Sequence, residues 1–381
     1  MEMQKRNPVI DILKGLGIIL MVAGHSGFPF TRFIYLFHMA IFFMASGFCF
    51  KSESSANVGT TIKFIKRRFI TLWLPYVVWT TLFSLLHNVF ISLNVYTDNP
   101  LILNYTDIGG GGLTDIWSYK TILKNICMSL LLSGGTQMGG ALWFICILMK
   151  ISLLYIFFDF IIKRFLKNTL IIQAILSVLL LCTGFIFYLR GISFLSFDKV
   201  LSYYCLFYFG FCLKSFNICE RFDSWYSRLF IFTGTFIILI ICKHFGRIEL
   251  ADTHYTNPVF LIITSVCGWM FLYELSYFIS KNRKLADGII VIGKNTIAVV
   301  ILHFLCFKIV SFIGIIITDA PEYVLACFPT YMKTGAWWVA YTIIGVGIPV
   351  LLSVIYKLIK QKVVPKCLQS KCLQNEQNSI V

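Results

Sequence analysis

Three polar residues in the first apolar segment have the types and spacing of a proton-transfer site. Asp11, Lys14 and His25 interrupt a stretch that is otherwise apolar. In a helix Asp11 lies one turn before Lys14, and His25 follows Lys14 after about three turns, with a rise of about 16 Å. The three side chains therefore share one face. The same spacing would also suit an interfacial ion pair followed by a structural histidine.

Two further histidines are expected near the depth of His25. His38 opens the second apolar segment after a short turn at 26–29, and His303 lies in the second half of a late apolar segment. An imidazole with its usual pKa of about 6.5 can take a proton from a hydroxyl that attacks an activated acyl group. We therefore predict His25, His38 and His303 as catalytic residues. Two of them could instead ligate a metal, but no third ligand has a suitable spacing, so no metal is expected.

Basic residues near the opposite ends of these segments are candidates for binding an anionic co-substrate. Lys14 belongs to the first segment, Arg67 and Arg68 end the basic amphipathic stretch 51–68, and Lys294 precedes the segment with His303. Each could attract phosphate on the cytoplasmic side. Arg67 and Arg68 could also simply anchor the next span, and Lys294 could be a lysine that snorkels to the interface.

The composition indicates that membrane-spanning helices position these residues. The chain has 381 residues, of which 58% are hydrophobic and only 13% are charged, against about 25% charged in soluble domains. This excludes a soluble enzyme, a disordered chain and a nucleic-acid-binding domain. We predict an all-α polytopic bundle of about ten spans, each near the ~20 residues that cross a bilayer. The predicted spans are 8–28, 33–50, 69–93, 138–162, 169–189, 199–215, 229–245, 258–279, 289–317 and 334–356.

The distribution of basic residues predicts the orientation. The formal net charge is +16, from 33 Lys and Arg against 17 Asp and Glu. Most of the Lys and Arg residues fall in the loops that become cytoplasmic if the N-terminus is inside, as the positive-inside rule requires. Both termini are therefore predicted to be cytoplasmic. We expect one transmembrane domain over residues 1–360 and a short basic cytoplasmic tail over 361–381.

These motifs together resemble the acyltransferase 3 family of integral membrane acyltransferases. Asp11 and Lys14 followed by His25 look like the opening of that family, and Phe37-His38-Met39 leading to Ser46-Gly47 looks like its second-span motif. The resemblance covers about residues 8–356. Weaker landmarks are Arg67-Arg68 with Leu74-Pro75-Tyr76, Leu142-Trp143-Phe144, Phe207-Tyr208-Phe209-Gly210, and Gly293 with Asn295-Thr296 leading to His303.

The resemblance implies a reaction and its substrates. It implies acetyl-CoA or another acyl-CoA as a cytoplasmic co-substrate, and O-acylation of a surface polysaccharide, a lipid-linked glycan or another carbohydrate. The paired basic residue and histidine of the family correspond to Lys14 and His25. Within the family the chain is most similar to the fucose 4-O-acetylase-like branch. We thus expect an O-acetyltransferase of the plasma or inner membrane, with lipids and glycan assembly or export machinery as partners and no nucleic acid.

Several alternatives remain open at this point. A transporter or exporter would also have ten spans and buried charge, although matching halves with broken helices are not apparent. A sensor or scaffold with an inactive site is a third class, against which the intact Lys14, His25 and His38 argue. Transfer is expected to be direct, because no Gly-x-Ser-x-Gly motif is present, but a covalent relay is not excluded. His87, His254 and the glycine-rich segment 94–120 have no assigned role, although the last is either a connector or a lid.

Overall fold

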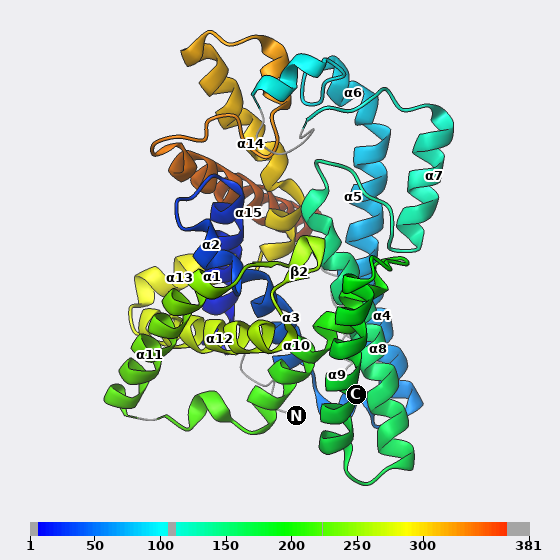
Figure 1. Ribbon diagram of the computed structural model, residues 1–381, viewed down its shortest axis with the longest axis vertical. Coiled ribbons are helices and arrows are strands. Elements are labelled where there is room, and N and C mark those ends of the chain that lie inside the picture. The colour runs from blue at the N-terminus through cyan, green and yellow to red at the C-terminus, as the bar shows by residue number, and fades with distance from the viewer. Residues whose placement is uncertain (1–6, 106–111, 223, 364–381) are drawn as a thin grey trace.

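The computed structural model describes residues 7–105, 112–222 and 224–363, and this part of the chain is built almost entirely from helices (Figure 1). Among these residues, nine helical segments are long and apolar enough to cross a membrane. The predicted all-α polytopic bundle is confirmed, whereas the side on which each terminus lies stays a prediction. The nine segments are Pro8–His25, Thr31–Phe48, Val58–Leu85, Gly140–Phe165, Thr169–Leu189, Trp225–Phe245, Pro258–Ser280, Thr296–Thr318 and Trp337–Gln361.

The tenth predicted span, 199–215, is the helix α10, Phe197–Ser215. It is not among the nine segments because its ends carry Asp198, Lys199 and Lys214, yet most of its length is buried. It packs mainly on α9 (Thr169–Leu189) and α3 (His38–Phe48). Gly47 of α3 and Gly210 of α10 each leave no room for a Cβ against the other backbone. Thus α10 is a central helix of the bundle whose charged residues lie at its ends.

Some predicted spans begin at a different residue or run through a break. The predicted span 69–93 starts earlier, because the basic amphipathic helix α4 (Val58–Arg68) continues through a π-helical turn into α5 (Leu74–Leu85). The predicted span 289–317 is divided between α13 (Arg283–Gly293) and α14 (Thr296–Thr318). The break is held by Asn295, whose side-chain oxygen accepts hydrogen bonds from Ser353 at 2.8 Å and Lys357 at 2.6 Å, both on α15 (Trp337–Val363).

Helix α1 (Pro8–His25) lies inside the bundle and carries the polar stripe. It contacts α13, α12 (Pro258–Ser280), α3, α15, α14 and the short helix α2 (Thr31–Tyr35). Figure 1 shows α1 enclosed by these elements. Its closest approach is to α13, where Gly15 and Gly293 let the two backbones touch, because a Cβ at Gly293 would overlap the carbonyl of Asp11. The stripe therefore faces protein.

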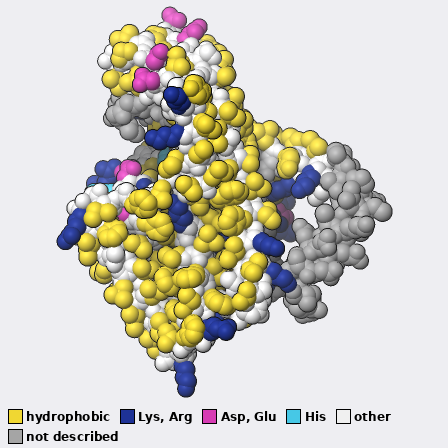
Figure 2. All heavy atoms as spheres, turned by 90° about the vertical axis from the view of Figure 1, so that its right-hand side faces the viewer, with side chains coloured by type: hydrophobic (Ala, Val, Ile, Leu, Met, Phe, Trp, Pro, Cys, Tyr) yellow, Lys and Arg dark blue, Asp and Glu magenta, His cyan; other side chains and the backbone are white. Residues whose placement is uncertain are grey.

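The peripheral helices expose apolar surface, as expected where lipid replaces water. Although they are hydrophobic, α9 and α11 (Trp225–Phe245) bury few of their residues within the bundle. Figure 2 shows hydrophobic side chains covering most of one face of the molecule. Contiguous apolar surface of this extent is characteristic of a membrane-facing protein. The complementary core is formed mainly by α1, α3, α8 (Trp143–Phe165), α10, α12 and α14.

The connections contain short elements that the sequence did not predict. An amphipathic helix α7 (Tyr119–Leu130) follows the long segment 94–120. The helix α6 (His87–Ser92) before that segment is the end of the predicted span 69–93, separated from α5 by a turn. Between α11 and α12, the strands β1 (Ile248–Glu249) and β2 (His254–Tyr255) pair in antiparallel fashion. The glycines at 109–111, which we considered as a lid or connector, and the tail from residue 364 onward lie outside the described residues.

Candidate functional site

His25 and His303 lie against one another. His25 is the last residue of α1 and His303 belongs to the second turn of α14. Their rings are stacked with centroids 5.6 Å apart and an angle of 24° between planes. Phe304 packs on both rings, 5.1 Å from His25 and 4.0 Å from His303. The structure thus brings together two of the three histidines predicted to be catalytic, from opposite ends of the chain.

The hydrogen bond of His303 determines which nitrogen can act as a base. Nδ1 lies 2.8 Å from the carbonyl oxygen of Val299, so Nδ1 carries the proton and donates it. Nε2 then holds a lone pair, and it is buried with no hydrogen-bond partner among the described residues. Because buried polar atoms are normally satisfied, this unpartnered nitrogen is a candidate base, although the His303 side chain itself is fully buried.

Tyr35 connects His25 to His38, the third predicted catalytic histidine. The Tyr35 hydroxyl lies 3.5 Å from Nδ1 of His25 and 3.3 Å from the carbonyl oxygen of Gly24. Its ring packs on the His38 ring with centroids 4.8 Å apart. His38 donates from Nδ1 to the carbonyl oxygen of Ile34 at 3.1 Å. The sequence analysis missed Tyr35, although its place one turn before His38 was a usable signal.

The predicted anion-binding cations divide into two that turn inward and two that are exposed. Lys14 forms an ion pair with Asp11 at 2.9 Å and its side chain is 22% exposed. Arg68 donates to the Ser46 hydroxyl at 2.8 Å and lies over the Phe64 ring. Arg67 and Lys294 are exposed. Lys294 follows Gly293, whose backbone touches that of Asp11. The backbone of Lys294 therefore lies near the turn of α1 that carries Asp11 and Lys14.

A small apolar cavity adjoins His25. Its volume is about 10 Å³, which is about the space that a single water molecule needs. It reaches from α1 to α3 and the start of α8. The lining residues are Ile18, Met21, His25, Met39, Phe42, Ala141, Trp143, Phe144 and Val300. A group that approaches the imidazole from this side meets an apolar wall with space for little more than a methyl group.

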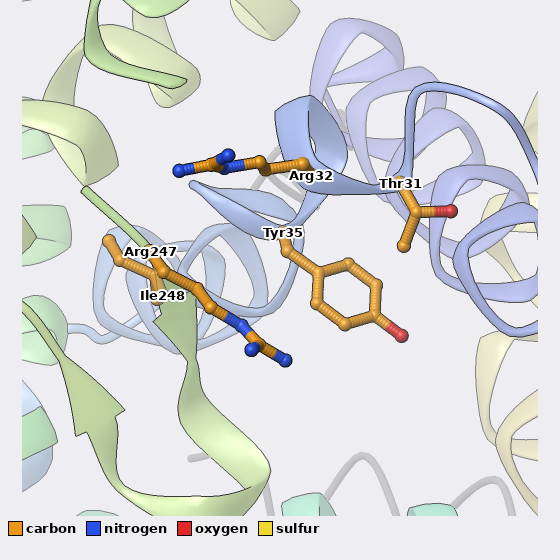
Figure 3. A pocket seen from close by; sticks show the side chains of 5 residues that line it. All are labelled: Thr31, Arg32, Tyr35, Arg247 and Ile248. Atoms are coloured by element: carbon orange, nitrogen blue, oxygen red, sulfur yellow. The ribbon is translucent and has the colours of Figure 1, made fainter. Parts of the chain in front are cut away.

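A larger cavity lies beside Tyr35. It has a volume of about 260 Å³ and is lined by Thr31, Arg32, Tyr35, Arg247 and Ile248. Figure 3 shows the two arginines on one side of the Tyr35 ring and the Tyr35 hydroxyl pointing away from them. This cavity, called the arginine pocket below, joins α2 to the strand β1. His25 therefore lies between a narrow apolar cavity and a wider cationic one, with Tyr35 between the histidine and the latter.

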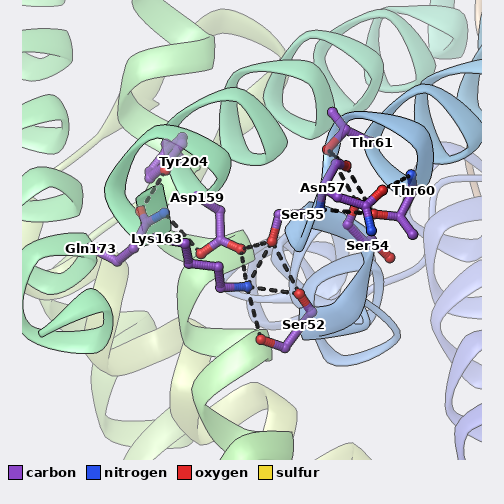
Figure 4. A network of polar contacts seen from close by, with 10 residues as sticks. All are labelled: Ser52, Ser54, Ser55, Asn57, Thr60, Thr61, Asp159, Lys163, Gln173 and Tyr204. Carbon is purple, nitrogen blue, oxygen red and sulfur yellow. Dashed lines mark hydrogen bonds and ion pairs between the residues drawn. The ribbon is translucent and has the colours of Figure 1, made fainter. Parts of the chain in front are cut away.

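Other buried charges have partners that explain them structurally. Asp159 of α8 accepts hydrogen bonds from Ser55 at 2.5 Å and Lys163 at 2.7 Å, within a network that extends to Gln173 (Figure 4). This network ties the segment before α4 to α8. Arg228 and Glu274 form a buried ion pair at 2.9 Å between α11 and α12. These groups join helices.

The remaining histidines of the sequence analysis lie apart from His25. His87 stacks on Trp117 with ring centroids 3.8 Å apart and donates from Nε2 to the carbonyl oxygen of Asp115 at 3.1 Å. Burial lowers the pKa of His87. His254 is exposed and its Nδ1 lies 2.8 Å from the Tyr188 hydroxyl. Within the described ranges, no three His, Cys, Asp or Glu side chains are grouped so as to hold a metal ion.

Comparison with known proteins gives the family. A family model described as an acyltransferase domain matches residues 7–354. Neither the curated proteins nor the solved structures contain a significant match to the chain. The matched region includes the polar stripe of α1, the second-span histidine and the α14 histidine, together with the apolar helices that position them. This chain belongs to the acyltransferase 3 family and is a multi-pass membrane acyltransferase.

Proposed function

We propose that the protein is an O-acetyltransferase that moves an acetyl group from cytoplasmic acetyl-CoA to a hydroxyl of a surface polysaccharide, a lipid-linked glycan or another carbohydrate. The observation that carries the proposal is the unpartnered Nε2 of the buried His303, whose ring stacks on the partly buried His25. The hydrogen bond to Val299 keeps the proton on Nδ1, so that Nε2 retains its lone pair and can accept a proton.

The donor enters from the end of α1 that carries Lys14. In this proposal Lys14 and Arg68 bind phosphates of CoA, and Arg67 and Lys294 add positive charge at the same entrance. CoA has a long flexible arm between its phosphates and its thioester. With Lys14 and His25 about 16 Å apart along one helix face, that arm brings the acyl group toward the imidazoles.

The proposed chemistry is a direct acyl transfer. Nε2 of His303 takes the proton of the acceptor hydroxyl while the hydroxyl oxygen attacks the thioester carbonyl. A carbon–oxygen ester bond forms, the carbon–sulfur bond breaks, and the proton passes to the departing CoA thiolate. His25 is stacked beside this base, and the Tyr35 ring, which packs on His38, contacts His25. No covalent enzyme intermediate is required.

The apolar cavity at His25 favours acetyl over longer acyl groups. Its volume of about 10 Å³ is small, and the Met39, Phe42 and Phe144 side chains line it. A methyl group is close in size to a water molecule, which needs about this space. A longer chain would have to displace these side chains. This preference agrees with the resemblance to the fucose 4-O-acetylase-like branch.

The proposal is tested with the purified protein in lipid nanodiscs. Incubation with radiolabelled acetyl-CoA and glycans extracted from the cell surface is expected to give alkali-labile, ester-linked label on the glycan. The His303→Ala and His25→Ala variants are expected to remain inserted and to lose transfer. His244→Ala, at the exposed end of α11, is the matched control and is expected to keep it.

Two results would contradict the proposal. A wild-type protein that moves glycan across the membrane but transfers no label would indicate a transporter. Normal O-acetyl content in glycans from cells that carry only the His303→Ala variant would remove the proposed base. The plasma or inner membrane is the expected location, since the acceptors belong to the surface, and glycan assembly or export machinery is the expected source of the acceptor.

A further inference from the structure

The arginine pocket has a charge that the proposed acetyl transfer does not use. Arg247 is bound to Glu249 at 2.6 Å. Arg32 is exposed and has no carboxylate partner among the described residues. Because Arg247 is paired with Glu249, the unpaired positive charge among the lining residues is that of Arg32; outside the lining, the negative charge of Asp252 also acts on Tyr35. Exposed ion pairs contribute little to stability. An incoming anion can therefore share Arg247 with Glu249, or displace Glu249 from it.

The position of the pocket relates it to the imidazoles. Tyr35 forms one of its walls, and the Tyr35 hydroxyl is 3.5 Å from Nδ1 of His25. The pocket lies at the C-terminal end of α1, beyond His25. The distribution of basic residues predicts that this end faces outward. A molecule that arrives from outside therefore meets Arg32 and Arg247 before it reaches the histidine pair.

The size of the pocket limits what it holds. Its volume of about 260 Å³ is slightly below the ~300–1,000 Å³ range of ligand pockets. This is room for a single sugar ring or its charged substituent, not for a longer glycan segment. Guanidinium groups bind planar carboxylates and phosphates through paired hydrogen bonds. A neutral sugar would leave the Arg32 guanidinium without a charged acceptor, while Arg247 keeps Glu249.

We infer that the arginine pocket binds an anionic group of the acceptor, so that the acyl acceptor is an acidic carbohydrate that carries a carboxylate or a phosphate. The inference rests on the proposed function, because that function is what identifies the bound ligand as the acyl acceptor. Arg32 and Arg247 hold the anion, and Tyr35 forms the wall that separates it from His25. The acceptor hydroxyl then reaches the histidine pair past the Tyr35 ring.

The test is a binding measurement that requires no catalysis. Protein in nanodiscs is titrated with glucuronate, glucose 1-phosphate and glucose at equal ionic strength, by calorimetry. Wild type is expected to bind at least one of the two anions and not to bind glucose. Preference for glucuronate indicates a uronic acid, and preference for glucose 1-phosphate indicates a phosphate-linked sugar. Arg32→Gln is expected to weaken anion binding about tenfold, because it removes a charge-assisted hydrogen bond.

A matched control separates the pocket from general surface charge. Arg190 is exposed at the end of α9, on the side predicted to face outward. Arg190→Gln is expected to leave binding unchanged, and Arg32→Lys to restore part of it. The inference is overturned if glucose binds as well as the anions, if neither anion binds, or if Arg32→Gln and Arg190→Gln behave alike. If the anions bind through Arg32 but the protein transfers no acetyl group, the anion-binding pocket is supported and the proposed function is rejected.

Discussion

Shortening Met39 tests whether the apolar cavity beside His25 holds the acyl group. Met39 lines this cavity and is partly buried on α3. The Met39→Ala substitution removes the three terminal heavy atoms of the side chain, which is more than the two extra methylenes by which a butyryl group exceeds an acetyl group. At about 0.8 kcal/mol per buried methylene, the gain for butyryl transfer is about 1.6 kcal/mol, or about fifteenfold in kcat/KM.

The assay compares acetyl-CoA with butyryl-CoA as donors for the wild-type protein and the variant. For the wild type, kcat/KM is expected to be higher for acetyl-CoA than for butyryl-CoA by at least about tenfold per added methylene. This is the lower end of the discrimination that an apolar pocket achieves for one methylene. In Met39→Ala this preference should fall by about fifteenfold, while acetyl transfer changes little. Met128→Ala, a partly buried methionine on α7 outside the cavity, is the control.

Two outcomes would refute the reasoning. If the wild type transfers butyryl as readily as acetyl, the cavity of about 10 Å³ is not where the acyl group lies. If Met39→Ala and Met128→Ala shift the preference equally, the effect comes from general loosening of the bundle. Equal thermal stability of the two variants in detergent would show that the comparison is fair.

Three further predictions concern single side chains. His303→Gln is expected to lower kcat by about a hundredfold or more with little change in KM, whereas His87→Gln should leave both unchanged in the same acetyl-transfer assay. Arg68→Ala is expected to raise KM for acetyl-CoA about tenfold but not for a short acetyl thioester that lacks phosphates, and an equal rise for both donors would contradict phosphate binding. Glu274→Gln leaves a buried arginine without its carboxylate, so the protein should lose about 3 kcal/mol or more of stability, seen as a lower melting temperature than for the exposed control Glu322→Gln.

The sequence predicted the bundle well because membrane spans are marked by composition. A run of about twenty apolar residues needs no tertiary information to be recognised. The prediction failed where tertiary contacts decide. The break between α13 and α14 at Asn295 depends on hydrogen bonds from Ser353 and Lys357, which belong to a helix far along the chain. The predicted span 199–215 is the helix α10, but the sequence did not show that it is a central helix whose terminal charges, such as Asp198, are satisfied by loop residues such as Thr253.

The candidate site was predictable along one helix and not across helices. The helical period alone placed Lys14 and His25 on one face of α1, and it placed Asp11 within reach of Lys14, as the 2.9 Å ion pair confirms. No local pattern says that His303 stacks on His25, because that contact requires α14 to pack on α1. Arg247 was missed for the same reason, since it reaches the pocket from the connection between α11 and α12.

A buried lone pair on a histidine does not by itself identify a catalytic base. His87 and His303 each donate one ring nitrogen to a backbone carbonyl, and each leaves the other nitrogen buried without a hydrogen-bond partner among the described residues. The ring of His87 is covered by Trp117, at a centroid distance of 3.8 Å. His303 instead stacks on His25, which borders the apolar cavity and contacts Tyr35 at the arginine pocket. His303 lines neither cavity itself, but of the two histidines it is the one that stacks on a cavity-lining residue, and this difference in surroundings, not in protonation, is the reason to prefer it to His87 for the proposed proton transfer.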